Sequence, residues 1–337
     1  MEPGQEDGAD PRRLEFDFGV GEGEERPFDK LRANGVNLTV DNQRCGLIAV
    51  VGAPNAGKST LVNALVGQKV AIVSPKAQTT RARLMGIAIQ DDTQLLLVDT
   101  PGIFDPARRL DRAMVAAAWE GSQGADLIAL VVDGKGGIGP KVRSVVAGLK
   151  DRRERKILIL NKVDIADKPR LLGHAASLNE LAEFEDTFFV SASTGDGVAE
   201  LKAELAKRMP EGPWHFPADQ VSDATDRMLA SEITREQLYH LLHAELPYAT
   251  AIETERYTEK PDGSVEIYQQ ILVERPTQRA IVLGQGGSKI KEIGSRARAE
   301  LANLLGVKVQ LFLHVKVRPG WEEDRSLYRE IGLDWVD

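Results

Sequence analysis

The chain has 337 residues and a formal net charge of −8, and its 42% hydrophobic and 28% charged residues are typical of a globular protein. This length exceeds one average domain, so two domains are expected. No apolar run approaches the roughly 20 residues of a membrane span, and the acidic start MEPGQEDGAD is unlike a secretory signal. Cys45 is the single cysteine, which excludes an internal disulfide. A cytoplasmic location is therefore expected.

Residues 1–44 are rich in Gly, Pro and charged side chains and have no sustained hydrophobic period. They are predicted to be a disordered, acidic N-terminal extension, and the folded pattern is expected to begin at Gly46. Acidic residues predominate in this extension, whereas residues 279–318 hold eight basic and only two acidic side chains. Because the local field decides whether a polyanion is attracted, the negative net charge does not exclude nucleic acid as a partner.

Strands and helices are predicted to alternate from residue 46 to residue 209. The strands are expected at residues 46–51, 84–90, 94–100, 126–133, 156–161 and 187–192. The helices are expected at residues 58–67, 107–121, 140–151, 168–183 and 197–209. Continuous apolar strands that alternate with amphipathic helices indicate an α/β domain whose mostly parallel sheet is covered on both faces. Its ligands are expected at the carboxyl ends of the strands.

The alternation stops at MPEGPWHFPADQV, residues 209–221, which contains three prolines and a glycine. Beyond it we expect a smaller α+β domain, in which Asp223 caps the first helix. Its strands are expected at residues 248–259, 264–274 and 307–317, with the turn Lys260-Pro261-Asp262-Gly263 between the first two, and its helices at residues 224–243, 276–283 and 288–305. The predicted boundaries are residues 45–209 for the first domain, 210–222 for the linker and 223–337 for the second domain.

The first glycine loop, GAPNAGKST at residues 52–60, follows a strand and opens a helix. It fits the pattern G-x-x-x-x-G-K-[ST], in which glycines turn backbone N–H groups onto phosphate oxygens. Lys58 is expected to reach the β- and γ-phosphates, and Ser59 to give an oxygen to Mg²⁺. A chance glycine turn is the alternative, and the strand–loop–helix context argues against it.

Three further motifs, each at the end of a strand, favour GTP over ATP. Asp99-Thr100-Pro101-Gly102 offers a carboxylate that reaches Mg²⁺ through water and a glycine N–H for the γ-phosphate. Asn161-Lys162-Val163-Asp164 offers a carboxylate for guanine N1–H and the exocyclic amine, a donor pair that adenine lacks. Ser191-Ala192-Ser193 completes the base pocket with backbone N–H groups. In this order the motifs predict a GTP-binding domain.

The loop Gln78-Thr79-Thr80-Arg81 lies between the first two motifs. We expect Thr80, or alternatively Thr79, to complete the Mg²⁺ shell only when γ-phosphate is present. Ile103 stands where many GTPases have a glutamine that orients the attacking water, so intrinsic hydrolysis should be slow or depend on other groups. Asn55 either helps to hold a monovalent cation or makes a hydrogen bond within its own loop.

The predicted site residues of this domain fall into three sets. The catalytic set is Lys58, Thr80 and Gly102, and the metal set is Ser59, Thr80 and Asp99. The nucleotide-binding set is Asn55, Ala56, Gly57, Lys58, Ser59, Thr60, Asp99, Gly102, Asn161, Lys162, Asp164, Ser191, Ala192 and Ser193.

The second glycine loop lies in IVLGQGGSKIKEIG, residues 281–294, between two predicted helices. A G-x-x-G loop in the order strand, helix, loop, helix, strand is that of a KH domain, here with the extra helix and strand of the type II arrangement, and it clamps about four single-stranded nucleotides. The alternative is a tight turn with a solvated basic face. The expected RNA contacts are Ile281, Gly284, Gln285, Gly286, Gly287, Lys289 and Lys291, and a groove for bases is expected from Ile281, Val282, Ile290 and Ile293. His240 and His243 are interpreted as helix-surface or packing residues.

These motifs, with GPWHFPADQVSD in the linker and VKVRPGW near the end, resemble the Era family of bacterial GTPases over about residues 45–337. The resemblance implies a P-loop GTPase domain followed by a type II KH domain, with GTP and Mg²⁺ as ligands. It implies GTP hydrolysis coupled to binding the 3′ end of 16S rRNA, in a factor that promotes maturation of the 30S subunit. It also implies peripheral association with the inner membrane and, from related members, K⁺ at Asn55. The family loop often has a lysine where Gln285 stands, so one phosphate contact is missing.

The chain is expected to be a monomer. The alternative function is a GTP-dependent regulatory switch that acts on a protein or membrane partner. A translational GTPase is disfavoured because no β-barrel pattern follows the first domain. The bases around the second glycine loop favour the RNA-binding function over the protein switch.

Overall fold

A computed structural model describes residues 43–76, 79–243 and 246–336 of the chain. Most of the predicted N-terminal extension, and Gln78 of the threonine loop, lie outside the described residues. The first strand begins at Arg44, two residues before the predicted start at Gly46. Among the residues that the structure describes, no helix has both the length and the apolar character that crossing a membrane would need.

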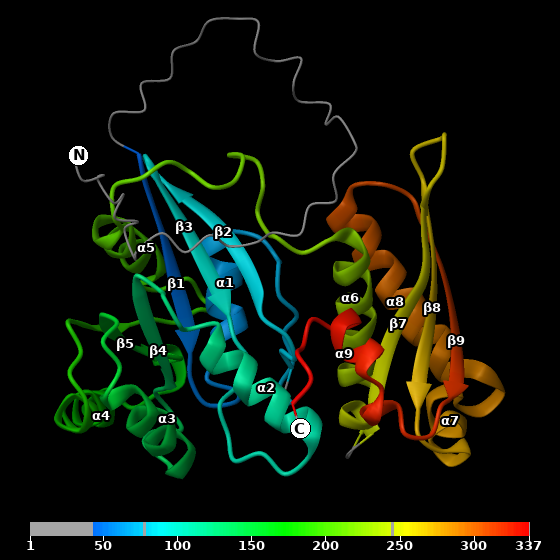
Figure 1. The fold of residues 1–337 in the computed structure, drawn as a ribbon, viewed down its shortest axis with the longest axis horizontal. Helices are drawn as coiled ribbons and strands as arrows, with labels where there is room; N and C mark the ends of the chain where they lie inside the picture. The colour runs from blue at the N-terminus through cyan, green and yellow to red at the C-terminus, as the bar shows by residue number, and fades with distance from the viewer. Residues whose placement is uncertain (1–42, 77–78, 244–245, 337) are drawn as a thin grey trace, which may run out of the picture. The chain divides into compact units, whose positions relative to one another are not determined.

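The first domain is built on a six-stranded sheet in the order β2-β3-β1-β4-β5-β6 (Figure 1). Its strands are β1 Arg44–Val51, β2 Leu84–Gln90, β3 Thr93–Asp99, β4 Leu127–Asp133, β5 Lys156–Asn161 and β6 Thr187–Phe189. Neighbouring strands are parallel except β2 and β3, which form an antiparallel hairpin. The mostly parallel sheet predicted from the apolar runs is thus confirmed. Strand β6 ends three residues earlier than predicted because the chain turns after Val190, where the Gly195 N–H donates to the Ser191 carbonyl.

Helices cover both faces of this sheet. They are α1 Lys58–Val66, α2 Arg109–Glu120, α3 Pro140–Lys150, α4 Lys168–Leu181 and α5 Val198–Arg208. Buried side chains of α1 and α5 join the strands in one core, and buried side chains of α2, α3 and α4 join them in another. The carboxyl ends of β1, β3, β4 and β5 are therefore left open between the helices for a ligand.

The linker runs along the edge strand β2. The Ile87 N–H donates to the Val221 carbonyl at 2.8 Å, and the Asp223 carboxylate accepts the Met85 N–H at 3.0 Å. The buried side chain of Gln94 also holds the linker, because its Oε1 accepts the backbone N–H groups of His215 and Phe216. The prediction that Asp223 caps the next helix was wrong, since its carboxylate is used at β2.

The second domain has a three-stranded sheet, β7 Thr250–Glu259, β8 Val265–Val273 and β9 Val309–Val317. Strands β7 and β8 are antiparallel, and β8 and β9 are parallel. Helices α6 Asp226–Leu241, α7 Pro276–Leu283 and α8 Ser288–Leu305 pack against the sheet. Thr225 caps α6 by accepting the Met228 N–H. The order of elements confirms the predicted small α+β KH domain.

Two details of the second domain were not predicted. Residues Leu246–Ala249 form a 3₁₀ turn, so β7 starts two residues later than expected. After β9, a 3₁₀ turn at Trp321–Glu323 and helix α9, Arg325–Glu330, bring buried Trp321 and Tyr328 into one cluster with Leu110 of α2. The sequence pattern of this C-terminal segment is too short to show a helical period.

Candidate functional site

The first glycine loop connects β1 to α1 in a conformation that requires glycine. Gly57 has φ 93°, and a Cβ there would lie 2.3 Å from Nδ2 of Asn161. A Cβ at Gly52 would lie 2.3 Å from the carbonyl oxygen of Val131. Close approach of the loop to β4 and β5 therefore explains both glycines of the motif. Lys58 is buried, and its Nζ donates to the carbonyls of Gly52 and Ala53, at 3.3 Å each.

The pKa of Lys58 is lowered to about 8, because burial disfavours its charged form more than nearby Asp99 favours it. Within the part of the chain that the structure describes, this buried ammonium group is held by two carbonyl oxygens, which leaves it suited to bind an anion. The cleft beside it, about 50 Å³ in volume, is lined by Asn55, Gly57, Ser59, Thr60, Thr80 and Gly102 among others.

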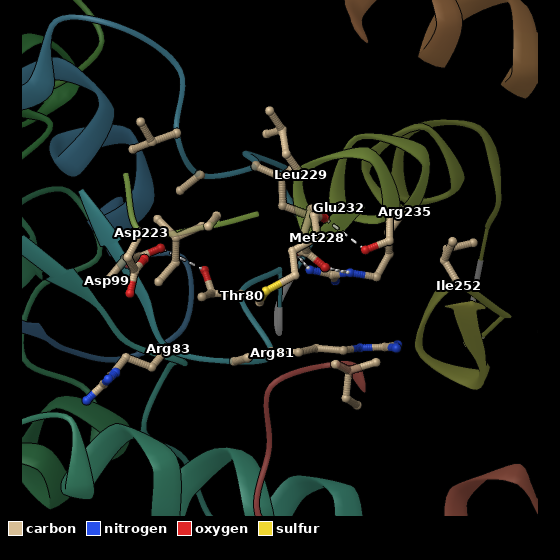
Figure 2. A pocket seen from close by; sticks show the side chains of 18 residues that line it. Thr80, Arg81, Arg83, Asp99, Asp223, Met228, Leu229, Glu232, Arg235 and Ile252 are labelled. Atoms are coloured by element: carbon tan, nitrogen blue, oxygen red, sulfur yellow. Dashed lines mark hydrogen bonds and ion pairs between the residues drawn. The ribbon is translucent and has the colours of Figure 1, made fainter. Parts of the chain in front are cut away.

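The three residues predicted to bind the metal meet at the start of α1. Ser59 Oγ donates to Asp99 Oδ2 at 2.6 Å and lies 2.8 Å from Thr80 Oγ1. Thr80 Oγ1 also donates to Asp99 Oδ2, at 3.1 Å; Figure 2 shows Thr80 and Asp99 turned toward each other. The hydroxyl of Thr79 instead donates to the Lys76 carbonyl at 2.8 Å. This geometry favours Thr80 over the alternative Thr79.

These residues fit a magnesium ion. Burial raises the pKa of Asp99, with Lys58 opposing, and its Oδ1 has no hydrogen-bond partner among the described residues. A buried carboxylate oxygen without a partner is costly, and a water molecule on a bound cation would satisfy it. Two hydroxyls that bind the ion and a carboxylate that reaches it through water match the oxygen ligands that Mg²⁺ takes alongside phosphate.

Gly102 follows β3 and lies against the glycine loop. A Cβ on Gly102 would be 2.9 Å from Cα of Pro54, so a side chain cannot be accommodated without moving the loop. The next residue, Ile103, donates its N–H to the Gly52 carbonyl at 3.1 Å, and its side chain is buried in the core on one face of the sheet. Ile103 therefore points away from the cleft and cannot orient a water there.

Asn161 and Lys162 hold the loops of the predicted base pocket together. Asn161 is 2% exposed; its Nδ2 donates to the Ala56 carbonyl at 3.0 Å, and its Oδ1 accepts the Ala192 N–H at 3.0 Å. Lys162 Nζ donates to the Asn55 carbonyl at 2.7 Å and to Asp133 Oδ2 at 2.6 Å. The glycine loop and the loops after β4, β5 and β6 are thereby joined.

Asp133 was not predicted, although it ends an apolar strand as Asp99 does. Burial raises its pKa, but hydrogen bonds from Lys162 and the Gly136 N–H outweigh burial and leave the pKa below its usual value. The carboxylate therefore stays ionised and anchors Lys162. Asp164 is exposed in the 3₁₀ turn Val163–Ile165, and Ser191 Oγ lies 3.1 Å from Ser193 Oγ.

The side chain of Asn55 makes a bond to the segment before Thr80. Its Nδ2 donates to the Pro75 carbonyl at 3.2 Å, and its backbone has φ 63°. The side-chain oxygen is the atom that a monovalent cation would take, because an amide nitrogen only donates hydrogen bonds.

The second glycine loop connects α7 to α8. Gly284, Gly286 and Gly287 have φ of 70°, 59° and 77°. A Cβ on Gly286 or Gly287 would meet no atom within 4 Å, so the open space there is not filled by protein packing. Lys289 Nζ donates to the Leu241 carbonyl at 3.3 Å, and Lys291 is exposed.

The predicted groove for bases needs a correction. Val282 and Ile293 are fully buried in the core of the second domain and cannot line a groove. Ile281 is 56% exposed and, with Leu241, Leu242, Gln278 and Lys289, lines a depression of about 460 Å³ next to the glycine loop. Ile290 is partly buried against the same core. His240 is exposed on α6, as expected, whereas His243 is exposed beyond the end of α6 at Leu241 and not on the helix.

Known proteins share both domains. The family model of the 50S ribosome-binding GTPase matches residues 47–162, and that of the KH domain matches residues 245–322. GTPase Era of Erythrobacter litoralis (strain HTCC2594) is 59% identical over 303 residues, covering 89% of this chain and 100% of its own. GTPase Era of Bradyrhizobium sp. (strain ORS 278) is 53% identical over 292 residues, covering 87% and 95%.

Two solved structures are similar over both domains. The crystal structure of Era in complex with MgGDPNP and nucleotides 1506–1542 of 16S ribosomal RNA has a TM-score of 0.81 and 35% identity, covering 86% of this chain and 99% of its own. An Aquifex aeolicus Era variant bound to GDP·AlF₄⁻ has the same TM-score, identity and coverage. With this identity and coverage of whole relatives, the chain belongs to the Era family of GTPases.

Proposed function

We propose that this chain binds GTP and Mg²⁺, hydrolyses GTP, and binds the 3′ end of 16S rRNA during maturation of the 30S subunit. The single observation that carries the nucleotide part is the meeting of Ser59, Thr80 and Asp99 beside the buried Lys58. The RNA part is supported by the open glycine loop and by the similarity to an Era structure that contains MgGDPNP and this RNA. We assign residues 45–209 to the GTPase domain, 210–222 to the linker and 223–337 to the KH domain.

In the proposed site, the N–H groups of residues 55–60 and the Lys58 ammonium bind the phosphates. Ser59 and Thr80 give hydroxyl oxygens to the Mg²⁺ shell, and Asp99 contacts it through water. When bound at these residues, Mg²⁺ would supply positive charge to offset the charge that develops on the phosphates. Gly102 donates its N–H to the γ-phosphate.

Guanine is recognised by Asp164, with Asn161 and Lys162 keeping the loops in place and Ser191, Ala192 and Ser193 closing the pocket. The side-chain oxygen of Asn55 contributes to a K⁺ site that assists hydrolysis. Because Ile103 is buried in the core, another group must position the attacking water.

RNA binds across Gly284, Gln285, Gly286 and Gly287, and the open space at Gly286 and Gly287 allows the sugar-phosphate backbone to approach the start of α8. Lys289 and Lys291 contact phosphates, and the exposed Ile281 contacts a base. Binding is coupled to the nucleotide, because Thr80 joins the Mg²⁺ shell only when the γ-phosphate of GTP is present.

Fluorescence anisotropy tests this function directly. The probe is a labelled RNA that copies the 3′ end of 16S rRNA, titrated with full-length protein loaded with GDPNP, a non-hydrolysable GTP analogue, or with GDP. The test variant carries Gly286→Asp and Gly287→Asp. The matched control is Gly263→Asp, since Gly263 in the β7–β8 turn has the same φ of 77° as Gly287 and equally open surroundings.

We expect tight binding in the GDPNP state, loss of binding in the double variant, and wild-type binding in the Gly263→Asp control. If no nucleotide state binds the RNA while the protein still binds GTP, the RNA function is wrong, and a protein partner becomes the better hypothesis.

A further inference from the structure

Arg81, the residue after Thr80, leaves the nucleotide site and enters the KH domain. Its side chain is 3% exposed. Nη1 donates to the Thr250 carbonyl at 2.7 Å, and Nη2 donates to the carbonyls of Pro247 and Tyr248 at 3.3 and 3.2 Å. In Figure 2 the Arg81 side chain points away from Asp99, whereas Thr80 faces it.

The chain just before Thr80 is bound to the same domain. Lys76 Nζ donates to the carbonyls of Tyr239 and Leu242 at the end of α6. The Val73 N–H donates to Glu236 Oε1 at 2.8 Å. The segment that carries Thr80 is therefore held by KH-domain groups on both sides of the threonine.

The chemistry of Arg81 suits a fixed position. A guanidinium presents its donors in a rigid planar fork and cannot lose its charge, so it matches a set of carbonyls in one geometry only. If Arg81 moved away from these carbonyls, its buried guanidinium would lose its hydrogen-bond partners, so moving Arg81 costs free energy. Since consecutive Cα atoms are about 3.8 Å apart, a displaced Arg81 cannot leave Thr80 where it is.

Space beside the segment allows such a displacement. A cavity of about 110 Å³ lies between residues 80–84 and α6, and Thr80, Arg81, Asp99, Glu232 and Arg235 are among its lining residues (Figure 2). The segment can therefore shift into existing space without first displacing closely packed side chains.

We propose that Arg81 is a positioning residue of the GTPase site: by binding the carbonyls of Pro247, Tyr248 and Thr250 it holds Thr80 at Ser59 and Asp99, so that the KH domain completes the cation site. The inference rests on the proposed role of Thr80 in GTP·Mg²⁺ binding. Linkage then requires the reverse effect, in which any ligand that moves residues 247–250 away from Arg81 weakens GTP relative to GDP.

The test compares the dissociation constants of fluorescent GDPNP and GDP, both in Mg²⁺, for full-length variants. We expect Arg81→Ala to weaken GDPNP by about tenfold while GDP changes by less than about twofold, because Thr80 serves only the triphosphate state. Arg81→Lys keeps the positive charge but not the planar guanidinium, so its loss of GDPNP affinity should lie between those of wild type and Arg81→Ala. The control is Arg83→Ala, because Arg83 is an exposed arginine of the same segment.

A purely structural role would weaken both nucleotides or lower only the fraction of active protein. In the double variant Thr80→Ala with Arg81→Ala, the loss of GDPNP preference should equal that of Thr80→Ala alone, because both changes remove one interaction. The inference would be overturned if the double variant lost the product of the two single losses of GDPNP preference. It would also be overturned if Arg81→Ala left that preference unchanged. If Arg81→Ala does not fold, Lys76→Met replaces it in the same titrations. A smaller loss of the preference for GDPNP over GDP would support the inference, and an unchanged preference would contradict it.

Failure of the proposed function remains distinguishable. If Thr80→Ala itself leaves the preference for GDPNP unchanged, the role proposed for Thr80 is wrong, and with it the inference. If Thr80→Ala lowers the preference and Arg81→Ala does not, only the inference about Arg81 is wrong. Neither outcome depends on whether the chain binds RNA.

Discussion

Replacing Asn161 with alanine removes one buried side chain that makes three hydrogen bonds, two of them to other loops. Its partners are the Ala56 carbonyl at 3.0 Å, the Ala192 N–H at 3.0 Å and the Lys162 N–H at 2.8 Å, and the first two bonds are buried. At about 1 kcal/mol for each bond, with a further cost for buried groups left unpaired, the variant should lose at least about 3 kcal/mol of stability. Affinity for GDP should fall by about tenfold or more, because the base pocket loses its support.

Urea unfolding followed by circular dichroism measures the stability, and titration with fluorescent GDP measures the affinity. Asn161→Asp should be destabilised at least as much, since it sets a carboxylate oxygen against the Ala56 carbonyl. The control is Asn179→Ala on α4, where the same side chain bonds to the Ala175 carbonyl and Thr187 Oγ1 at an exposed position. That variant should stay within about 0.5 kcal/mol of wild type. Equal losses in Asn161→Ala and Asn179→Ala would refute the reasoning.

Three further predictions concern the linker, the γ-phosphate loop and the RNA groove. Gln94→Leu removes hydrogen bonds to the linker backbone and should cost about 2 kcal/mol in urea unfolding, whereas an unchanged midpoint would show that the linker is held by other contacts. Gly102→Ala places a methyl group 2.9 Å from Cα of Pro54 and should weaken GDPNP more than GDP in the same titration; equal weakening would contradict a role at the γ-phosphate. Ile281→Ala should weaken RNA binding with little change in stability, whereas Val282→Ala should cost about 2 kcal/mol of stability. If Val282→Ala weakened RNA binding more than Ile281→Ala did, the RNA groove would lie elsewhere.

The sequence predicted the GTPase fold well because β1, β3, β4 and β5 are buried, and buried parallel strands appear as uninterrupted apolar runs. The glycine motifs were recognisable for a related reason. Gly57 and Gly102 are required by atoms that would collide with a Cβ, so the pattern of glycines records the close approach of backbone segments.

Other features depend on contacts between segments distant in the chain, which no local pattern contains. Asp223 has the residue type of a helix cap, but its carboxylate binds the Met85 N–H, more than a hundred residues away. Val282 and Ile293 are apolar like Ile281, and only the packing of α7 and α8 on the sheet decides which of them is exposed. Arg81 stood in a recognised motif, yet its carbonyl partners lie in the other domain.

The bonds between the linker and β2 have a consequence for isolating the GTPase domain. Strand β2 is an edge strand, and Ser222 forms an antiparallel bridge with Gly86 while the Asp223 N–H donates to the Met85 carbonyl at 3.3 Å. A recombinant fragment that ends at Met209 would leave these backbone groups open to pairing with a second molecule, which is a common route to aggregation. Extending the fragment to Asp223 would keep the edge covered. The solubility of the separate GTPase domain should therefore depend on the linker and on the first residue after it.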